Sequence, residues 1–250
     1  AQDRTALVRT AIDLGVNYFD TARLYGEAEA LLGAALRGVP RGRFVVATKF
    51  FPVDSGGSMH DVPPEAPVIS PGQLRRSVDE SLAALGLDFV DVLQIHGVRP
   101  AWLAPVLDRL GDTLAALRIA GKFRCLGVTE TLVADPGRAM VPLAAANPQI
   151  DVALVAYHPA NPDAAAAALP ACARAGLGVV AMAEAARATH HTDAYRFAIA
   201  HPAVACVLTG TLSAAHLRDN VAAVALATTS LISPASTASP SAARAAPRFA

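Results

Sequence analysis

Four polar side chains of complementary chemistry stand at or just after the ends of three apolar segments that are typical of buried strands. Asp20 ends the first segment and Tyr25 follows it by five positions, while Lys49 ends the second segment and His96 the third. Each residue alone has a common structural explanation, since Asp often caps helices, a Lys after a strand often marks a return to water, and a His at a strand end is often structural. If the three segments are parallel barrel strands, however, their C-terminal ends gather the four side chains on one face.

Together the four side chains form a set that can supply a proton to a developing oxyanion. Reduction of a carbonyl carbon leaves negative charge on the oxygen, which needs a proton or a strong hydrogen bond. A tyrosine has an ordinary pKa of about 10 and is a weak acid. We expect the ammonium of Lys49 to lower the pKa of Tyr25, and Asp20 to keep that ammonium charged and oriented. A neutral His96 would donate a hydrogen bond that positions the carbonyl.

The order of these residues resembles the signature of the aldo-keto reductases, and the resemblance extends over about residues 4–226. It implies an NADPH- or NADH-dependent oxidoreductase that interconverts an aldehyde or ketone and its alcohol, with a small-molecule carbonyl substrate. Tyr25 would be the general acid, and Asp20, Lys49 and His96 would complete the catalytic set. The implied fold is an α/β protein, a (β/α)8 TIM-type barrel.

The same resemblance implies a cofactor site on the later strands and the last helix. Asn220 stands at the position of an adenine-contacting Asn, and Gly210 lies in the turn before the helix start, where backbone N–H groups suit a phosphate. His216 replaces an Arg that many members use for the 2′-phosphate, which leaves the choice between NADPH and NADH open. Thr129 and Glu130 replace the usual Ser-Asn beside the nicotinamide. The implied cofactor-binding residues are Thr129, Glu130, Leu154, Met182, Gly210, Thr211, His216 and Asn220.

An alternation of strands and helices positions these residues. The apolar pattern predicts strands over 16–20, 44–49, 89–95, 123–128, 151–156, 177–182 and 204–208. It predicts helices from Asp3 to Leu14 and over 27–37, 71–85, 103–120, 136–146, 162–175, 192–200 and 213–227. Such an alternation indicates a parallel sheet with helices outside it. The Pro- and Gly-rich stretch 52–72 is a predicted loop at the C-terminal end of the second strand, where loops shape substrate pockets.

Seven strands are found where a closed barrel of this type has eight, and the family comparison makes the first strand the missing one. Two interpretations are open: the chain is an N-terminally truncated version of an ordinary barrel, or a seven-stranded open barrel is real. We favour truncation, because an open barrel exposes two sheet edges to unwanted pairing. Residues 1–227 are accordingly predicted to form an N-terminally incomplete barrel. Residues 228–250, rich in Ser, Pro and Ala, are a predicted disordered tail.

Composition limits the remaining possibilities. The formal net charge is zero and no basic block occurs, which argues against a nucleic-acid partner. No uninterrupted apolar run is long enough for a membrane span, and no secretory signal is visible at the start. The three widely spaced cysteines are expected to be buried reduced thiols. We therefore expect a cytoplasmic protein, either a monomer or a small homo-oligomer.

Two other classes of function are compatible with the same residues. One is a nucleotide-binding barrel that acts as a scaffold or regulatory subunit with weak or no catalysis, because the expected contacts to the nicotinamide are altered. The other is a phosphate-binding isomerase or aldolase in which Lys49 forms a Schiff base. The acidic neighbour Asp20 argues against this second class, because Schiff-base lysines favour desolvated surroundings poor in anions.

Overall fold

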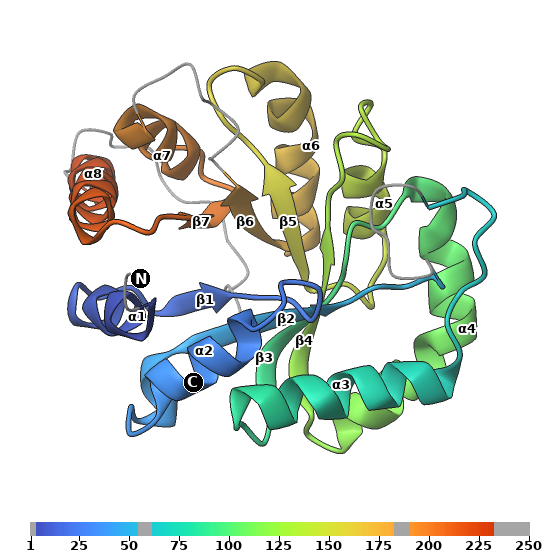
Figure 1. Cartoon of the computed structure of the whole chain (residues 1–250). Helices are drawn as coiled ribbons and strands as arrows, with labels where there is room; N and C mark the ends of the chain where they lie inside the picture. The colour runs from blue at the N-terminus through green and yellow to red at the C-terminus, as the bar shows by residue number, and fades with distance from the viewer. Residues whose placement is uncertain (1–3, 55–61, 183–190, 233–250) are drawn as a thin grey trace.

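The computed structural model describes residues 4–54, 62–182 and 191–232, and strands alternate with helices throughout (Figure 1). The strands are β1 Tyr18–Asp20, β2 Val45–Phe50, β3 Val90–Ile95, β4 Phe123–Thr129, β5 Val152–Ala156, β6 Gly178–Met182 and β7 Val204–Leu208. The α-helices are α1 Arg4–Asp13, α2 Ala28–Leu36, α3 Pro71–Leu85, α4 Pro100–Ile119, α5 Met140–Ala146, α6 Pro162–Ala175, α7 His191–Ile199 and α8 Ala214–Ile232. A short 3-10 turn, Arg41–Arg43, precedes β2.

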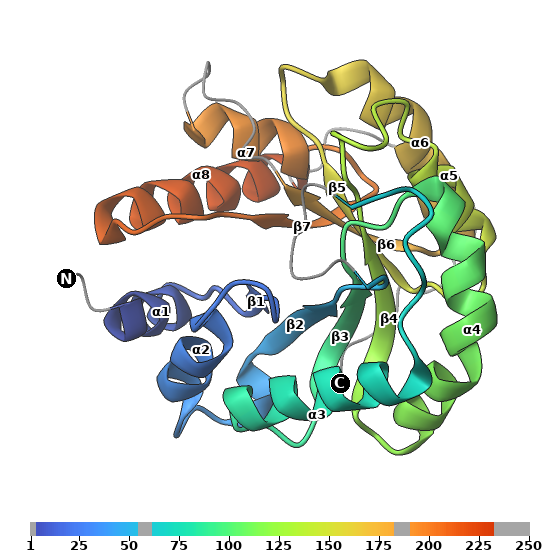
Figure 2. The same cartoon turned by 45° about the vertical axis from the view of Figure 1, so that its right-hand side comes forward.

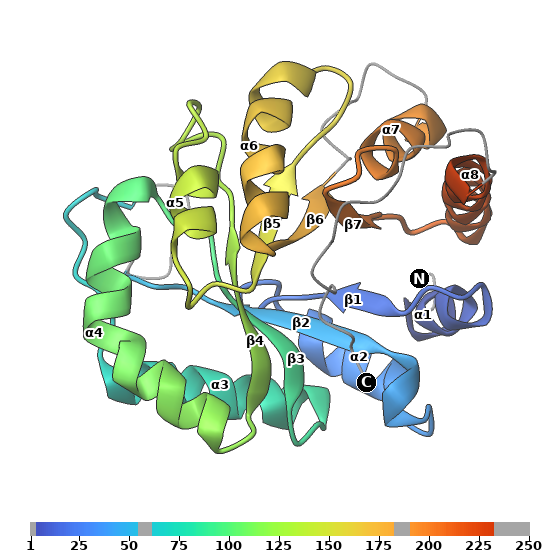
Figure 3. The ribbon, with the colours of Figure 1, turned by 180° about the vertical axis from the view of Figure 1, so that it is seen from behind.

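All seven strands are parallel and pair in chain order from β1 to β7. The helices surround the strands, as the view from behind also shows (Figure 3). The predicted barrel architecture is thus confirmed, and the described residues contain seven of its strands. Among the described residues, no further strand pairs with the outer edges of β1 and β7, and the barrel stays open between them.

The ends of three helices differ from the sequence prediction. Helix α5 begins at Met140 and not at 136, because Asp135 accepts hydrogen bonds from the N–H groups of Ala139 and Met140 and so holds the preceding residues in a turn. Helix α4 begins at Pro100, a residue whose fixed φ suits the first helical position. Helix α8 continues to Ile232, past the predicted end at 227, and the remainder of the predicted tail lies outside the described residues.

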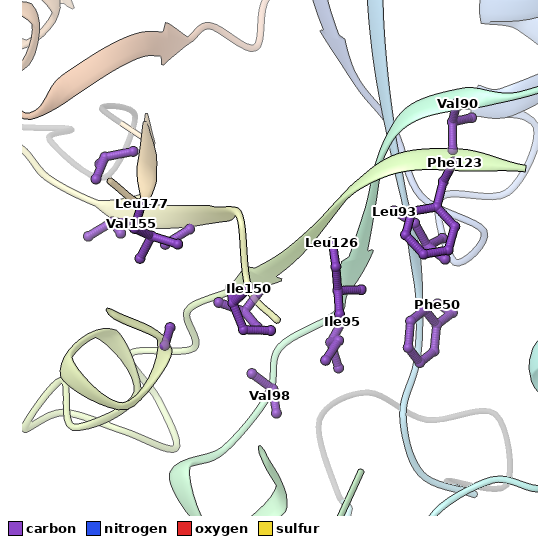
Figure 4. Close-up of a cluster of buried hydrophobic side chains, with 14 of the residues drawn as sticks. Phe50, Val90, Leu93, Ile95, Val98, Phe123, Leu126, Ile150, Val155 and Leu177 are labelled. Carbon is purple, nitrogen blue, oxygen red and sulfur yellow. The ribbon is translucent and has the colours of Figure 1, made fainter. Parts of the chain in front are cut away.

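Two apolar layers lie on the two sides of the strands. The larger layer fills the space between strands and helices, and Figure 4 shows part of it, with Phe50, Leu93 and Phe123 from neighbouring strands packed together. The smaller layer lies inside the barrel and includes Ala47 and Val92. This inner layer is completed by half-buried side chains, namely Tyr18, Val45, Cys125, Met182, Cys206 and Leu208.

The three cysteines are free thiols, as expected, but only Cys172 is buried. Cys125 and Cys206 are half-buried, because they belong to the inner layer of a barrel that is open on one side. The expectation of three fully buried thiols is therefore wrong for these two. No described helix combines the length and apolar character needed to cross a membrane.

Candidate active site

A buried ion pair between the ends of β1 and β2 forms the floor of the candidate site. Lys49 Nζ donates to Asp20 Oδ1 and, at 2.8 Å, to the carbonyl oxygen of Thr21. The side chain of Lys49 is 1% exposed and that of Asp20 is 11% exposed. Burial raises the pKa of Asp20 and lowers the pKa of Lys49, while their mutual attraction opposes both shifts. The ammonium is thus held in place by two oxygen acceptors.

Tyr25 lies over this pair, on the loop after β1, and reaches the residue that follows β3. Its hydroxyl is 3.5 Å from His96 Nε2, and the two rings meet edge to face with their centroids 5.6 Å apart. Lys49 Nζ lies 4.9 Å from the centroid of the Tyr25 ring. The structure therefore brings Asp20, Tyr25, Lys49 and His96 together at one end of the strands. The Tyr25 hydroxyl contacts His96, while Lys49 faces the Tyr25 ring.

The electrostatics of this cluster differ from the sequence prediction at Tyr25. Partial burial, followed by the charge of Asp20, raises the pKa of Tyr25 to about 12, so the predicted lowering is wrong for this geometry. The physical reason is that burial penalises the charged phenolate, and the nearby negative charge of Asp20 adds to this penalty. Burial, followed by the charge of Lys49, lowers the pKa of His96 to about 4. At neutral pH the site therefore holds a protonated phenol beside a neutral imidazole.

Sequence reasoning missed one member of the cluster, Gln94 on β3. Its side chain points into the barrel, where Nε2 donates to Asp20 Oδ2 at 2.7 Å. Gln94 is fully buried and stands beside Lys49 in the register of β2 and β3. The available signal was a polar residue at an inward position of the otherwise apolar stretch that ends β3.

A cavity of about 740 Å³ opens beside these residues and continues through the open side of the barrel. Asp20 and Tyr25 line its inner end. Its outer end runs between the free edges of β1 and β7, where α1 and α8 lie nearby (Figure 2). Most of the outer lining is aliphatic and comes from α1, α2 and α8, in particular Leu7, Val8, Ala11, Leu31, Leu32 and Leu217.

The predicted cofactor residues on β4, β5 and β6 divide into two groups. Leu154 and Met182 line the cavity and contribute apolar surface to it. Thr129 is buried outside the lining, and its hydroxyl oxygen accepts a hydrogen bond from the N–H of Gly97 at 2.6 Å. In this position Thr129 holds the loop that follows His96.

Glu130 borders the cavity, but its carboxylate already accepts hydrogen bonds from other residues of the protein. Both carboxylate oxygens accept from Arg138 Nη1, at 3.2 and 3.0 Å, and Oε2 also accepts from the N–H of Ala156 at 2.9 Å. The side chain of Glu130 is 0% exposed. Burial raises the pKa of Glu130, and the Ala156 N–H and Arg138 act in the opposite direction. The carboxylate is therefore not open to a ligand in this conformation, and no sequence pattern singled out Arg138 as its partner.

The predicted phosphate and adenine segment forms a turn and a capped helix start between β7 and α8. Gly210 and Thr211 line the cavity. The Ser213 hydroxyl caps α8 by accepting from the N–H of His216 at 3.3 Å, and the His216 side chain is exposed. Asn220 is buried and donates from Nδ2 to Thr209 Oγ1 at 2.9 Å. Their roles toward a cofactor stay predictions.

Comparisons with known proteins agree with this architecture. The family model described as "Aldo/keto reductase family" matches residues 1–187. An L-galactose dehydrogenase from Arabidopsis thaliana is 36% identical over 131 residues, which are 51% of this chain and 38% of that protein. An NADH-specific methylglyoxal reductase from Escherichia coli is 30% identical over 138 residues, 51% of this chain and 42% of the relative. An aldo-keto reductase structure from Pseudomonas aeruginosa superposes with a TM-score of 0.71 at 28% identity, covering 91% of this chain and 85% of that one.

The parallel strands with their outer helices, the cluster at the strand ends and the family match define the class of protein. The chain belongs to the aldo/keto reductase family. It spans about two fifths of the length of the two curated relatives named above.

Proposed function

We propose that this protein is an oxidoreductase that uses NADPH or NADH to interconvert a small carbonyl compound and its alcohol. The observation that carries the proposal is the contact between the Tyr25 hydroxyl and His96, 3.5 Å apart, over the Lys49–Asp20 pair at the inner end of the cavity. Membership of the family and a methylglyoxal-reducing relative support the class of substrate.

Each residue of the cluster has a role that follows from its geometry. When bound, the dihydronicotinamide supplies a hydride to the carbonyl carbon. Tyr25 donates a proton to the carbonyl oxygen, which is the position where negative charge develops. His96 stays neutral because of its low pKa, and it can donate a hydrogen bond to the same oxygen. Lys49 Nζ, 4.9 Å from the centroid of the Tyr25 ring, attracts the phenolate once it forms.

The residues present fit a dinucleotide along the cavity, with one departure. Gly210 and Thr211 lead into the start of α8, where the first N–H groups have no intrahelical acceptor and suit a phosphate. Leu154 and Met182 provide an apolar wall for a flat ring, and a Met packs favourably on aromatic rings. The departure is Glu130, whose enclosed carboxylate leaves the cofactor amide without the side-chain partner that the sequence suggested.

A nucleotide titration followed by a turnover assay tests the proposal. Quenching of Trp102 fluorescence reports binding of NADPH or NADH, and loss of reduced-nicotinamide absorbance with methylglyoxal or an aldose reports turnover. We expect saturable binding of at least one nucleotide and carbonyl-dependent oxidation. Binding without oxidation across a panel of aldehydes would favour the scaffold alternative. Absence of binding would contradict both.

The enclosed Glu130 carboxylate is the observation that favours a scaffold or regulatory role as the second candidate. The Schiff-base alternative is disfavoured by a different observation. Lys49 is paired with Asp20 and donates to a backbone carbonyl, so its amine is occupied by two oxygen acceptors and is not open to a substrate carbonyl.

A further inference from the structure

Gln94 reaches across the inside of the barrel from β3 to the catalytic carboxylate at the end of β1. The two oxygens of Asp20 are divided between two partners: Oδ1 accepts from Lys49 and Oδ2 accepts from Gln94 at 2.7 Å. Because the two donors come from neighbouring strands, they fix the plane of the carboxylate as well as its position. A carboxylate held only by Lys49 could rotate about its bond to Cβ.

The barrel leaves room for this reach by placing a glycine on the next strand. Gly127 is the register neighbour of Gln94 on β4. A Cβ added at Gly127 would lie 3.0 Å from Gln94 Cγ and 3.2 Å from Val92 Cγ1. A side chain at 127 would crowd Gln94 Cγ, which would have to shift by a few tenths of an ångström. The absence of a side chain at Gly127 therefore leaves space for the Gln94 side chain.

The surroundings of Gln94 give its amide one strong interaction. Gln94 is 0% exposed, and its Oε1 is buried without a hydrogen-bond partner among the described residues. Leaving a buried polar atom unpaired costs about 1–3 kcal/mol. A leucine or methionine would fill the same volume without that cost, so stability alone does not account for a glutamine here. Its Nε2 bond to Asp20 does account for it.

We propose that Gln94 is a positioning residue of the active site: it fixes Asp20, and through Asp20 it holds the Lys49 ammonium under the Tyr25 ring. The inference rests on the proposed function, in which Tyr25 is the proton donor. Gln94 itself does not touch the reacting atoms, since its contact is with the far oxygen of Asp20.

The charge on Asp20 gives this role a pH signature. Burial raises the pKa of Asp20, and the bonds from Lys49 and Gln94 lower it. The other titratable groups that act on this pair are Tyr18 on β1, Tyr25 on the following loop, Cys206 on β7, His96 after β3 and Glu29 on α2. A substitution at Gln94 leaves all of these titratable groups in the protein. Loss of the Gln94 bond therefore raises the pKa of Asp20 further and leaves the others in place.

The test compares Gln94→Met with Gln149→Met, the same change at an exposed position after α5. For Gln94→Met we expect kcat/KM for carbonyl reduction to fall roughly ten- to hundredfold, since misplacement of a catalytic group has effects of this size. Nucleotide affinity, measured by fluorescence, should stay within about twofold. The acid limb of the kcat/KM profile should move to higher pH. An unchanged kcat/KM, or a lower one with an unmoved acid limb, would overturn the proposal.

A second variant gives the opposite pH trend. In Gln94→Glu, one proton shared between two adjacent carboxyl groups can replace the amide donor at low pH, while at high pH two carboxylates repel each other. We expect its activity to approach the wild-type value at low pH and to fall as the pH rises. A fall toward low pH, parallel to that of Gln94→Met, would contradict the assigned role.

A measurement without turnover separates this inference from the proposed function. The stability deficit of Gln94→Met relative to the wild type should shrink as the pH falls, because a protonated Asp20 no longer needs the amide donor. Urea unfolding from pH 8 to pH 5 measures this deficit. A deficit that does not change with pH would overturn the inference, even if the wild type reduces carbonyls. A wild type that reduces no carbonyl would contradict the proposed function. The pH dependence of the stability deficit would still show whether the hydrogen bond from Gln94 to Asp20 stabilises the carboxylate.

Discussion

The change Lys49→Met tests whether the floor of the site is a true buried ion pair. The methionine keeps most of the volume of the side chain but leaves the Asp20 carboxylate, 11% exposed, without its cation. Removing one partner of a buried pair typically costs about 3–5 kcal/mol. At about 2–4 °C per kcal/mol for a chain of this size, the melting temperature should fall by about 6–20 °C at pH 8.

The pH dependence of this loss has a definite sign. The pKa of Asp20 is already raised by burial, and loss of Lys49 raises it further. A carboxyl group with a raised folded-state pKa destabilises the folded protein above that pKa, and the penalty disappears as the pH falls through it. We therefore expect the deficit of Lys49→Met to be smaller at pH 5 than at pH 8.

Urea unfolding of a double-mutant set gives the control. The double variant Asp20→Asn with Lys49→Met removes both charges, and replacing a whole buried pair is often close to neutral in stability. We expect it to recover most of the loss at pH 8. A double variant that is as unstable as Lys49→Met, or a deficit that is the same at both pH values, would refute the buried-pair description.

Three further changes test other parts of the structure. A Cβ at Gly33 would overlap the carbonyl group of Leu85, where α2 meets α3, so Gly33→Ala should lower the free energy of unfolding by about 3 kcal/mol. Gly111 in α4 has open space around it, so Gly111→Ala should raise the free energy of unfolding by about 0.4–1 kcal/mol. Urea midpoints that fall in the reverse order would contradict the packing of these helices. His216→Arg, exposed in the first turn of α8, should favour NADPH over NADH by about tenfold in Kd, and an unchanged ratio would mean that this turn does not face a 2′-phosphate.

The sequence predicts the architecture well because strand period and residue type are local signals. The predicted strand 44–49 is observed as Val45–Phe50, and the predicted helix 71–85 as Pro71–Leu85. Prediction is poorer where contacts between distant residues decide. The start of α5 is moved by Asp135, and the turn before it contains Arg138, with a φ of 55° and a buried pair with Glu130.

The candidate site shows the same division. Strand ends alone are sufficient to bring Asp20 and Lys49 together. Gln94 was missed because its role depends on a contact with Asp20 two strands away, and on the space that Gly127 leaves on the opposite side of β3. The predicted direction of the pKa shift at Tyr25 is wrong, because the shift is set by burial and by the charge of Asp20 in the folded protein, which the sequence pattern does not show.

The measurement that tests the central claim most directly is the turnover of Tyr25→Phe with a saturating reduced nicotinamide nucleotide. The change removes only the phenolic oxygen, and Tyr157→Phe makes the same change on a buried ring outside the cavity lining. If Tyr25 is the proton donor, carbonyl reduction should fall roughly a hundredfold or more in Tyr25→Phe, with nucleotide affinity unchanged, and should stay near the wild-type value in Tyr157→Phe. Carbonyl reduction by Tyr25→Phe at the wild-type rate would contradict the account.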